Sequence, residues 1–285
     1  MNKCLLSVLL AVAGPCAAEV IEEVVNVPVV VVDARGKPVK QEIVVTVFRD
    51  TLHARSPYLV LNHGRAPTQH DRAKLGRARY ADNSRYFVSK GFAVLVPTRV
   101  GYGFSGGADV ENAGACAKPD YAVRLRPVVA QTRQVLTNIA ALGYLDSTQG
   151  IVVGQSVGGF GAIAVSTADI PGLKAVINFS GGAGGDPDKR PESPCSPDEL
   201  LQTFGDYGAK ARVPSLWFYS VNDKYWGEQL PREWFAAYTK NGGKGQFVSL
   251  PAYKSNGHPI FTGNPQVWKR DFEQFLKGLN ITAAR

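Results

Sequence analysis

Ser156 lies at the centre of the stretch GQSVG, between glycines two residues before and two residues after it. A serine acts as a nucleophile when its hydroxyl is raised clear of the backbone, a base takes its proton, and donors hold the oxyanion that forms. A sharp strand-to-helix turn raises the hydroxyl and brings the flanking residues so close together that both must be glycine. The apolar run before Gly154 favours a strand, and "FGAIAVST" after Gly158 is compatible with a helix. The stretch therefore predicts a nucleophilic Ser156.

Glycine-rich turns have other uses, which the spacing of this one does not favour. A dinucleotide-binding loop has the pattern G-x-G-x-x-G after the first strand of a unit, with an acidic residue further on. A Walker loop, which binds nucleotide phosphates, contains Gly-Lys-Ser or Gly-Lys-Thr. Neither pattern is present around Ser156. A glycine-rich turn that only permits close packing remains the structural alternative.

The partners of a nucleophilic serine in such a turn follow it in the chain, the acid first and the histidine second, each at the end of a later strand. His258 is the only one of the four histidines after Ser156, and it follows the last apolar run. Asp223 comes directly after the apolar run before that, although an aspartate after asparagine is also an ordinary turn residue. Asp186 and Asp188 follow an earlier run and are alternatives. We assign the acid to Asp223, because both order and position fit.

The oxyanion of an ester intermediate needs two backbone N–H donors, one from the residue after the nucleophile and one from the loop after the third strand. Val157 supplies the first donor. In "LVLNHGRAP" the pair His63-Gly64 stands at the right strand end, so Arg65 supplies the second through its main chain. We expect His63 to brace this loop and not to move protons.

Aromatic residues near two strand ends are candidates for an apolar acyl or alcohol pocket. Aromatic side chains at such positions are as often part of the core as of a binding site. The candidates are Tyr102, Phe104, Tyr225 and Trp226.

The segment 65–85 is basic. Its side chains either form a basic entrance that favours anionic or polyanionic substrates, or cover a solvated helix face, and the second reading is favoured. The charged residues are Arg65, Arg72, Lys74, Arg77, Arg79 and Arg85, against Asp71 and Asp82.

Short apolar runs alternate with segments of helical spacing over most of the chain, which predicts a mostly parallel sheet with helices on both faces. Two β-branched runs near the N-terminus predict an antiparallel hairpin ahead of this sheet, which then has about eight strands. Helices are predicted at 79–90, 123–142, 158–167, from Ser196 with Pro197 at its first position and a capping box, and from 264–265.

Residues 1–18 have the basic start, short apolar run and small residues of a secretory signal peptide, and the alternative is a buried N-terminal helix. Residues 19–285 are then one catalytic domain. Cleavage removes two of the four cysteines, and two cysteines left in an exported protein usually bond to each other. We therefore predict a disulfide between Cys116 and Cys195, with free or metal-bound thiols as the weaker alternative.

The formal net charge of +8 comes from basic residues spread along the whole chain with acidic residues among them. This distribution favours solubility, or a mild preference for anionic surfaces, over nucleic-acid binding. The apolar run of the signal is too short to span a bilayer, so no stable membrane anchor is predicted.

The chain from about Tyr58 to its C-terminus resembles the α/β-hydrolase superfamily, nearest to its dienelactone hydrolase-like and esterase or lipase-like branches. The resemblance rests on "NHG", "FVSKGFAVLVPTRVGYGFS", "GQSVGG", "SVNDKYW" and "NGHPIF". Thr98 stands where many members have aspartate, and Val100 where glycine is frequent. Dienelactone hydrolases proper use a cysteine nucleophile, so Ser156 favours esterase chemistry.

The resemblance implies an α/β-hydrolase fold and hydrolysis of carboxylic esters through an acyl-enzyme, with Ser156, His258 and Asp223 as the triad. It calls for no metal and no organic cofactor. The expected substrate is a small-molecule or polymeric ester, and the expected location is the periplasm or the medium. A peptidase or polyester depolymerase with the same triad is an alternative. A non-catalytic binding protein of this fold is the last alternative. It would be expected to lack one or more triad residues, whereas a serine, an aspartate and a histidine stand at all three positions here.

Overall fold

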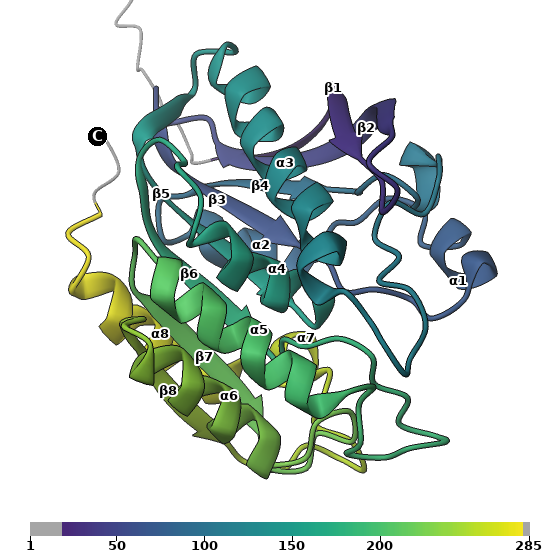
Figure 1. Ribbon diagram of the computed structural model, residues 1–285. Coiled ribbons are helices and arrows are strands. Elements are labelled where there is room, and N and C mark those ends of the chain that lie inside the picture. Colours follow the sequence, from purple (N-terminus) through teal and green to yellow (C-terminus); the bar gives the residue numbers. More distant parts are fainter. Residues whose placement is uncertain (1–18, 282–285) are drawn as a thin grey trace, which may run out of the picture.

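Eight strands form one sheet in the computed structural model, which describes residues 19–281 (Figure 1). The predicted signal peptide, 1–18, lies outside the described residues. The strand order is β1-β2-β4-β3-β5-β6-β7-β8, antiparallel for the first two pairings and parallel for the rest, as predicted. The strands are β1 Val20–Val32, β2 Pro38–Asp50, β3 Ser56–Asn62, β4 Ala93–Pro97, β5 Leu145–Gln155, β6 Leu173–Phe179, β7 Ser215–Ser220 and β8 Gly245–Leu250.

The predicted N-terminal hairpin consists of β1 and β2, which pair from Val20 opposite Asp50 to Val32 opposite Pro38. Its turn contains Gly36 at φ +82°, a conformation that few residues other than glycine adopt. Alternate residues of β1, such as Val27 and Val29, are buried, while the residues between them are more exposed. This alternation is the pattern of a strand with one face on the core.

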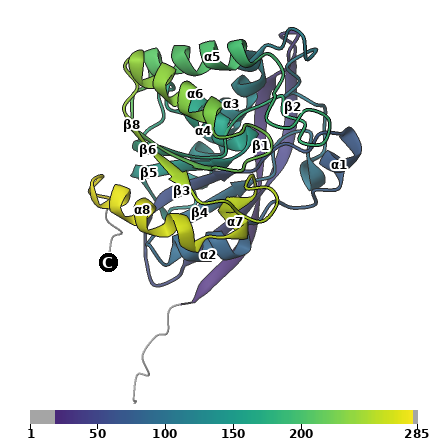
Figure 2. The ribbon, with the colours of Figure 1, turned by 90° about the horizontal axis from the view of Figure 1, so that it is seen from below.

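Helices cover both faces of the sheet, because the central strands are apolar on both sides (Figure 2). On one face lie α3 Tyr121–Ala140, α4 Val157–Val165, α5 Pro197–Lys210 and α6 Gln229–Lys240. On the other lie α2 Ala81–Val88, α7 Ile260–Gly263 and α8 Gln266–Lys277. The remaining short helix is α1 Gln69–Ala73, and a 3-10 turn covers Gly103–Ser105.

All five predicted helices are present, with ends that differ by a few residues, but the predicted capping box before α5 is wrong. Ser196 adopts a left-handed conformation with φ 44°, and its side chain makes no capping hydrogen bond. Its hydroxyl donates to the carbonyl oxygen of Cys116 instead, at 3.0 Å. The neighbouring disulfide holds that carbonyl within reach, so a tertiary contact displaces the local cap. Pro197 does occupy the start of the helix.

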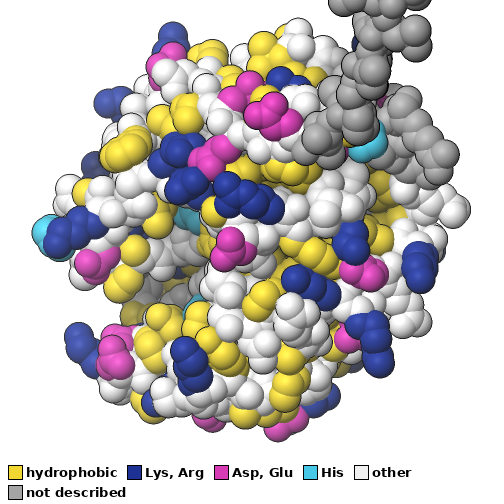
Figure 3. Space-filling view, turned by 180° about the vertical axis from the view of Figure 1, so that it is seen from behind, with side chains coloured by type: hydrophobic (Ala, Val, Ile, Leu, Met, Phe, Trp, Pro, Cys, Tyr) yellow, Lys and Arg dark blue, Asp and Glu magenta, His cyan; other side chains and the backbone are white. Residues whose placement is uncertain are grey.

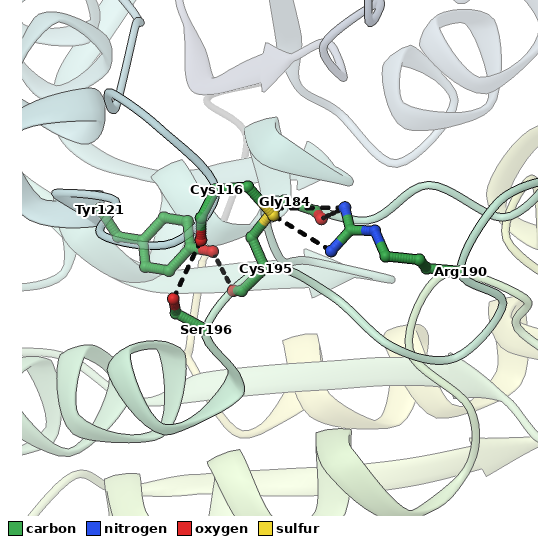
Figure 4. The surroundings of a disulfide bond; sticks show 6 residues. All are labelled: Cys116, Tyr121, Gly184, Arg190, Cys195 and Ser196. Atoms are coloured by element: carbon green, nitrogen blue, oxygen red, sulfur yellow. Dashed lines mark hydrogen bonds between the residues drawn. A yellow bond between two sulfur atoms is a disulfide. The ribbon is translucent and has the colours of Figure 1, made fainter.

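The predicted disulfide between Cys116 and Cys195 is present, and it joins the loop after β4 to the segment before α5 (Figure 4). The Tyr121 hydroxyl donates to the carbonyl oxygen of Cys195. The Arg190 guanidinium lies 3.1 Å from the Cys116 sulfur and 3.2 Å from the Cys195 sulfur. Two loops that are distant in sequence are therefore held together by one covalent bond and several polar contacts.

Within residues 19–281, no helix is long and apolar enough to cross a membrane.

We predict that the double variant Cys116→Ala/Cys195→Ala loses about 2–4 kcal/mol of unfolding free energy, because the disulfide constrains a long loop in the unfolded chain. The two cysteines are 79 residues apart. Urea unfolding at equilibrium measures the difference. A reductant should destabilise the wild type and leave the double variant unchanged. Equal unfolding free energies for the two oxidised proteins would contradict the prediction.

Candidate active site

Ser156 lies in a sharp turn between β5 and α4, with φ 56° and ψ −126°. Such a positive φ is strained for a residue with a side chain, and strained residues persist where surrounding structure holds them. The turn is so tight that a Cβ at Gly154 would lie 2.0 Å from the Gly158 carbonyl oxygen. A Cβ at Gly158 would lie 2.2 Å from the carbonyl oxygen of Asn62. Both flanking glycines are therefore required by packing.

The loop after β3 and the segment after β6 both pass beside Ser156. A Cβ at Gly64 would lie 3.2 Å from the Ser156 Cβ and 3.7 Å from its Oγ. The Ser156 carbonyl oxygen accepts a hydrogen bond from the Gly182 N–H at 3.4 Å, and the Ser156 N–H donates to Phe179 at 2.9 Å. The serine thus lies where the carboxyl ends of β3, β5 and β6 meet, the edge at which open α/β sheets bind ligands.

His258 and Asp223, on the loops after β8 and β7, are hydrogen-bonded to each other. The His258 Nδ1 lies 2.9 Å from Oδ2 and 3.1 Å from Oδ1 of Asp223. The carboxyl group is fully buried, and Oδ1 also accepts the Tyr225 N–H at 2.8 Å. An Nδ1–H that donates to the carboxylate leaves Nε2 of the ring as the proton acceptor. Asp186 and Asp188 make no such bond to His258.

Asn256, which no motif in the sequence marks, connects the loops that carry Asp223 and His258. Its Oδ1 accepts the His258 N–H at 3.0 Å and the Lys224 N–H at 3.1 Å. Lys224 is the residue after Asp223. One side-chain oxygen therefore holds the two loops in register. The only signal in the sequence is an asparagine before Gly257, which is typical of any turn.

Two aromatic rings surround the His258 imidazole. Tyr225 stacks on it with ring centroids 3.9 Å apart, and Trp226 meets it edge-on at 5.7 Å. The Trp226 Nε1 donates to the Ser180 carbonyl oxygen at 2.8 Å, and its ring packs on Gly182, whose N–H contacts Ser156. Trp226 therefore lies between the histidine and the segment that borders the serine.

Within residues 19–281, the Ser156 Oγ makes no hydrogen bond with the His258 ring. Hydrogen bonds between nucleophile and base are often long in ligand-free proteins and shorten when substrate binds. Two backbone N–H groups also lack a protein acceptor within residues 19–281: that of Val157, which follows the serine, and that of Arg65, which follows Gly64. Val157 begins α4, and the first N–H groups of a helix have no partner within it.

A buried ion pair supports the loop that carries Arg65. Arg99 and Glu111 are both fully buried, and Nε of the arginine lies 2.5 Å from the carboxylate. The Arg99 Nη1 donates to the His63 carbonyl oxygen at 2.6 Å, and its backbone N–H donates to His63 Nε2 at 3.1 Å. Burial raises the pKa of Glu111, but the charge and hydrogen bond of Arg99, together with smaller contributions from His63 and Tyr102, outweigh it and leave the pKa below its ordinary value.

His63 is held in its neutral form by this arrangement. Its Nε2 accepts the Arg99 N–H, so Nδ1 carries the proton and donates to the Gly64 carbonyl oxygen at 2.6 Å. Burial and the nearby charge of Arg99 lower the pKa of His63 from 6.5 to about 3. The ring thus braces the loop and is unsuited to exchange protons near neutral pH.

The four aromatic residues proposed for a pocket have different environments. Tyr225 and Trp226 lie against His258, as described. Tyr102 is buried, donates to Glu111 at 2.7 Å and packs edge-on against His63, so it supports the loop and does not line a surface. Phe104 is 73% exposed, on the 3-10 turn after β4.

The basic segment 65–85 is neither an open basic entrance nor a simple solvated face, because several of its arginines pair with carboxylates from other segments. Arg65 and Arg72 share Asp109, at 2.6 and 3.1 Å. Arg77 and Arg79 share Glu22 on β1, at 2.8 and 2.5 Å. Figure 3 shows basic and acidic side chains next to each other over much of one face of the molecule. A hollow is visible near the left edge of this view.

Two other hollows on the surface do not include the residues around Ser156. One surface hollow is lined by residues of β1 and β2, and another lies between α5 and α6. Neither is lined by a residue named above as part of the serine site. Over residues 19–281, no group of three or more His, Cys, Asp or Glu side chains is placed to hold a metal ion.

No family model and no curated protein matches the sequence, but many solved structures share its fold. An acetyl xylan esterase from Paenibacillus sp. R4 is similar with a TM-score of 0.60 and 16% identity, over 93% of this chain and 90% of that one. A putative dienelactone hydrolase from Klebsiella pneumoniae has a TM-score of 0.58 and 15% identity, over 90% and 98%. The Pyrococcus horikoshii acylaminoacyl peptidase has a TM-score of 0.59 and 13% identity, over 93% of this chain and 43% of that one. The chain therefore has the α/β-hydrolase fold.

We predict that His63 makes folding stability depend on pH below neutrality. Its pKa is lowered on folding from 6.5 to about 3. The unfolded chain therefore binds a proton that the folded chain does not, and the contribution of His63 is complete above pH 6.5 and is lost as the pH falls towards 3. Between pH 6.5 and 5 the wild type should lose about 1.5–2 kcal/mol more unfolding free energy than His63→Asn.

Urea unfolding at several pH values gives this difference as a slope, which does not depend on how much His63→Asn destabilises the protein. His70→Asn, which changes an exposed histidine on α1, is the matched control and should keep the wild-type slope. Parallel curves for the wild type and His63→Asn would show that His63 is not held neutral by the fold.

Proposed function

We propose that this protein is a serine hydrolase that cleaves carboxylic esters through an acyl-enzyme. The observation that carries the proposal is the turn at Ser156, in which a strained serine comes directly before the unpaired N–H of Val157 and packs on Gly64, the residue before Arg65. Turns that only permit packing have no need of a strained, non-glycine residue at the centre. The hydrogen-bonded pair of His258 and buried Asp223 supports the same function.

In the proposed mechanism, the Ser156 Oγ attacks the ester carbonyl carbon while Nε2 of His258 takes its proton. Asp223 holds the Nδ1–H of the ring, and so fixes the tautomer and stabilises the imidazolium. The N–H groups of Val157 and Arg65 donate to the oxyanion. His258 then gives the proton to the departing alcohol, which leaves the acyl group on Ser156. Water, deprotonated by His258, then attacks the acyl carbonyl carbon. The bond from that carbon to the Ser156 Oγ breaks, His258 returns the proton to the Oγ, and the acid leaves.

A peptidase or a polyester depolymerase with the same triad is the alternative. The acetyl xylan esterase and the acylaminoacyl peptidase are both similar in fold, so the fold does not separate ester from amide substrates. We favour esters because the alcohol of an ester departs readily. The amine of an amide is a much poorer leaving group and must be protonated at the same site before it departs. We also propose export to the periplasm or the medium, which the Cys116–Cys195 disulfide supports.

We predict that the wild type hydrolyses 4-nitrophenyl esters of short acyl chains and that Ser156→Ala lowers kcat at least about a thousandfold, since triad members act as a unit. Absorbance of the released 4-nitrophenolate measures the rate. The chain-length optimum reports the depth of the acyl pocket. Ser89→Ala, at the exposed end of α2, is the control and should retain full activity. Turnover that persists in Ser156→Ala would exclude this serine as the nucleophile.

We predict that Asn256 is a positioning residue for the triad. Asn256→Ala removes the acceptor shared by the His258 and Lys224 N–H groups, so kcat should fall about tenfold or more while KM changes little. Asn256→Asp keeps an acceptor oxygen at the same place and should recover much of the lost kcat. Equal kcat in wild type and Asn256→Ala, or no recovery by Asn256→Asp, would count against the role.

A further inference from the structure

Arg124, in the first turn of α3, has no acidic partner. It makes no ion pair and no side-chain hydrogen bond with any residue of the described range 19–281, and its Nε is buried without a partner. Its guanidinium lies over the Tyr121 ring, 6.0 Å from the centroid. The adjacent carboxylate, Asp120, accepts the Val123 N–H at 2.8 Å and caps the helix instead. A partly buried positive charge without a counter-ion is costly.

The charges around Arg124 do not compensate it. Arg65 and Arg72 already share the single carboxylate of Asp109, and Glu111 is taken by Arg99. Burial lowers the pKa of Arg124, and the positive charge of Arg65 lowers it further. The negative charge of Glu111 raises the pKa of Arg124, but burial and Arg65 outweigh it, so the surroundings leave the positive charge of Arg124 uncompensated.

Arg124 also lies on the side of the molecule where the candidate nucleophile is. Gln131 of the same helix accepts the Val100 N–H just beyond the carboxyl end of β4, at 2.8 Å. Arg124 precedes it by two turns of helix, about 10 Å, and so lies beyond that edge of the sheet. Its neighbour Arg65 follows Gly64, which packs on Ser156. The side chain is only partly buried, so a ligand can reach it.

We propose that Arg124 binds a carboxylate of the substrate, so that the preferred substrates are esters that carry a negative charge. This inference rests on the proposed ester hydrolysis. An anionic group would supply the counter-ion that the fold lacks, and a guanidinium binds a carboxylate through two parallel hydrogen bonds. Arg65 would remain engaged by Asp109 and hold the loop.

Two matched substrate pairs test the proposal. One places the charge in the acyl part, the 4-nitrophenyl half-ester of glutaric acid against 4-nitrophenyl valerate. The other places it in the alcohol part, 4-acetoxybenzoate against its methyl ester. In at least one pair, Arg124→Gln should lower the ratio of kcat/KM for the anionic ester to that for the neutral ester by about ten- to a hundredfold, chiefly through KM.

Arg126→Gln is the matched control, because it removes the same charge from an exposed position on the same helix. It should leave both ratios unchanged. Arg124→Met, which retains most of the apolar stem, is the second variant if Arg124→Gln does not fold. Equal losses for anionic and neutral esters would show a structural role for Arg124. Equal effects of the two arginine variants would show a general charge effect. Both results overturn the proposal.

Calorimetric titration of each intact anionic ester, the glutarate half-ester and 4-acetoxybenzoate, into Ser156→Ala separates binding from turnover. Binding of at least one of them should weaken at least tenfold in Ser156→Ala/Arg124→Gln and stay the same in Ser156→Ala/Arg126→Gln. If the wild type hydrolyses none of the esters, the proposed function fails, while this titration still decides the role of Arg124. Binding that does not depend on Arg124 overturns the inference even where Ser156 proves to be the nucleophile.

Discussion

The close contact of three backbone segments around Ser156 is the constraint on which the site depends. Gly154 touches Gly158 across the turn, and Gly158 touches the carbonyl oxygen of Asn62 at the end of β3. These contacts leave no room for a Cβ, so the end of β3 and the start of α4 are held at one distance from each other. The N–H groups of Val157 and Arg65 belong to those two segments. Their relative position therefore follows from backbone packing, whatever their side chains do.

The loop after β3 has few apolar contacts of its own, and buried charge takes their place. Arg99 binds the His63 backbone and ring nitrogen while Glu111 neutralises it. Buried ion pairs stabilise folding little compared with apolar packing, because both charges lose their hydration. They do impose direction, since each hydrogen bond has a preferred geometry. The pair is thus better suited to fixing the loop than to stabilising the domain.

The disulfide joins the two sides of the same site. Cys116 follows the loop that contains Arg99 and Glu111, and Cys195 follows the segment that contains Gly182 and packs against Trp226. One side supports the Arg65 N–H and the other supports the ring of His258. A covalent link between them limits how far the two sides can separate. The disulfide therefore helps to hold the groups around Ser156 in position, in addition to stabilising the fold.

The sequence predicted the strands, the main helices and the disulfide, and its assignment of Ser156, Asp223 and His258 as a triad stays a prediction. Apolar runs identify buried strands, and glycines at fixed offsets identify the turn at Ser156. It did not single out Asn256, Glu111 or Arg124, whose surroundings depend on residues distant in the chain. It placed Ser196 in a capping box, whereas the Ser196 hydroxyl donates to the Cys116 carbonyl oxygen, and for Tyr102 it left pocket and core open, where the structure shows a buried hydroxyl that donates to Glu111. Tertiary partners decided these cases, and local patterns do not encode them.

The same distinction applies to the arginines, because their number along the chain does not give the charge that a ligand would meet. Most arginines near the site are close to carboxylates from β1 or from the loop after β4, so their number in the segment 65–85 says little about the field that a ligand meets. What a ligand meets is the charge left after pairing. By that measure Arg124, which lies outside the basic segment, is the arginine for which we propose an anionic partner, because no carboxylate within residues 19–281 is paired with it.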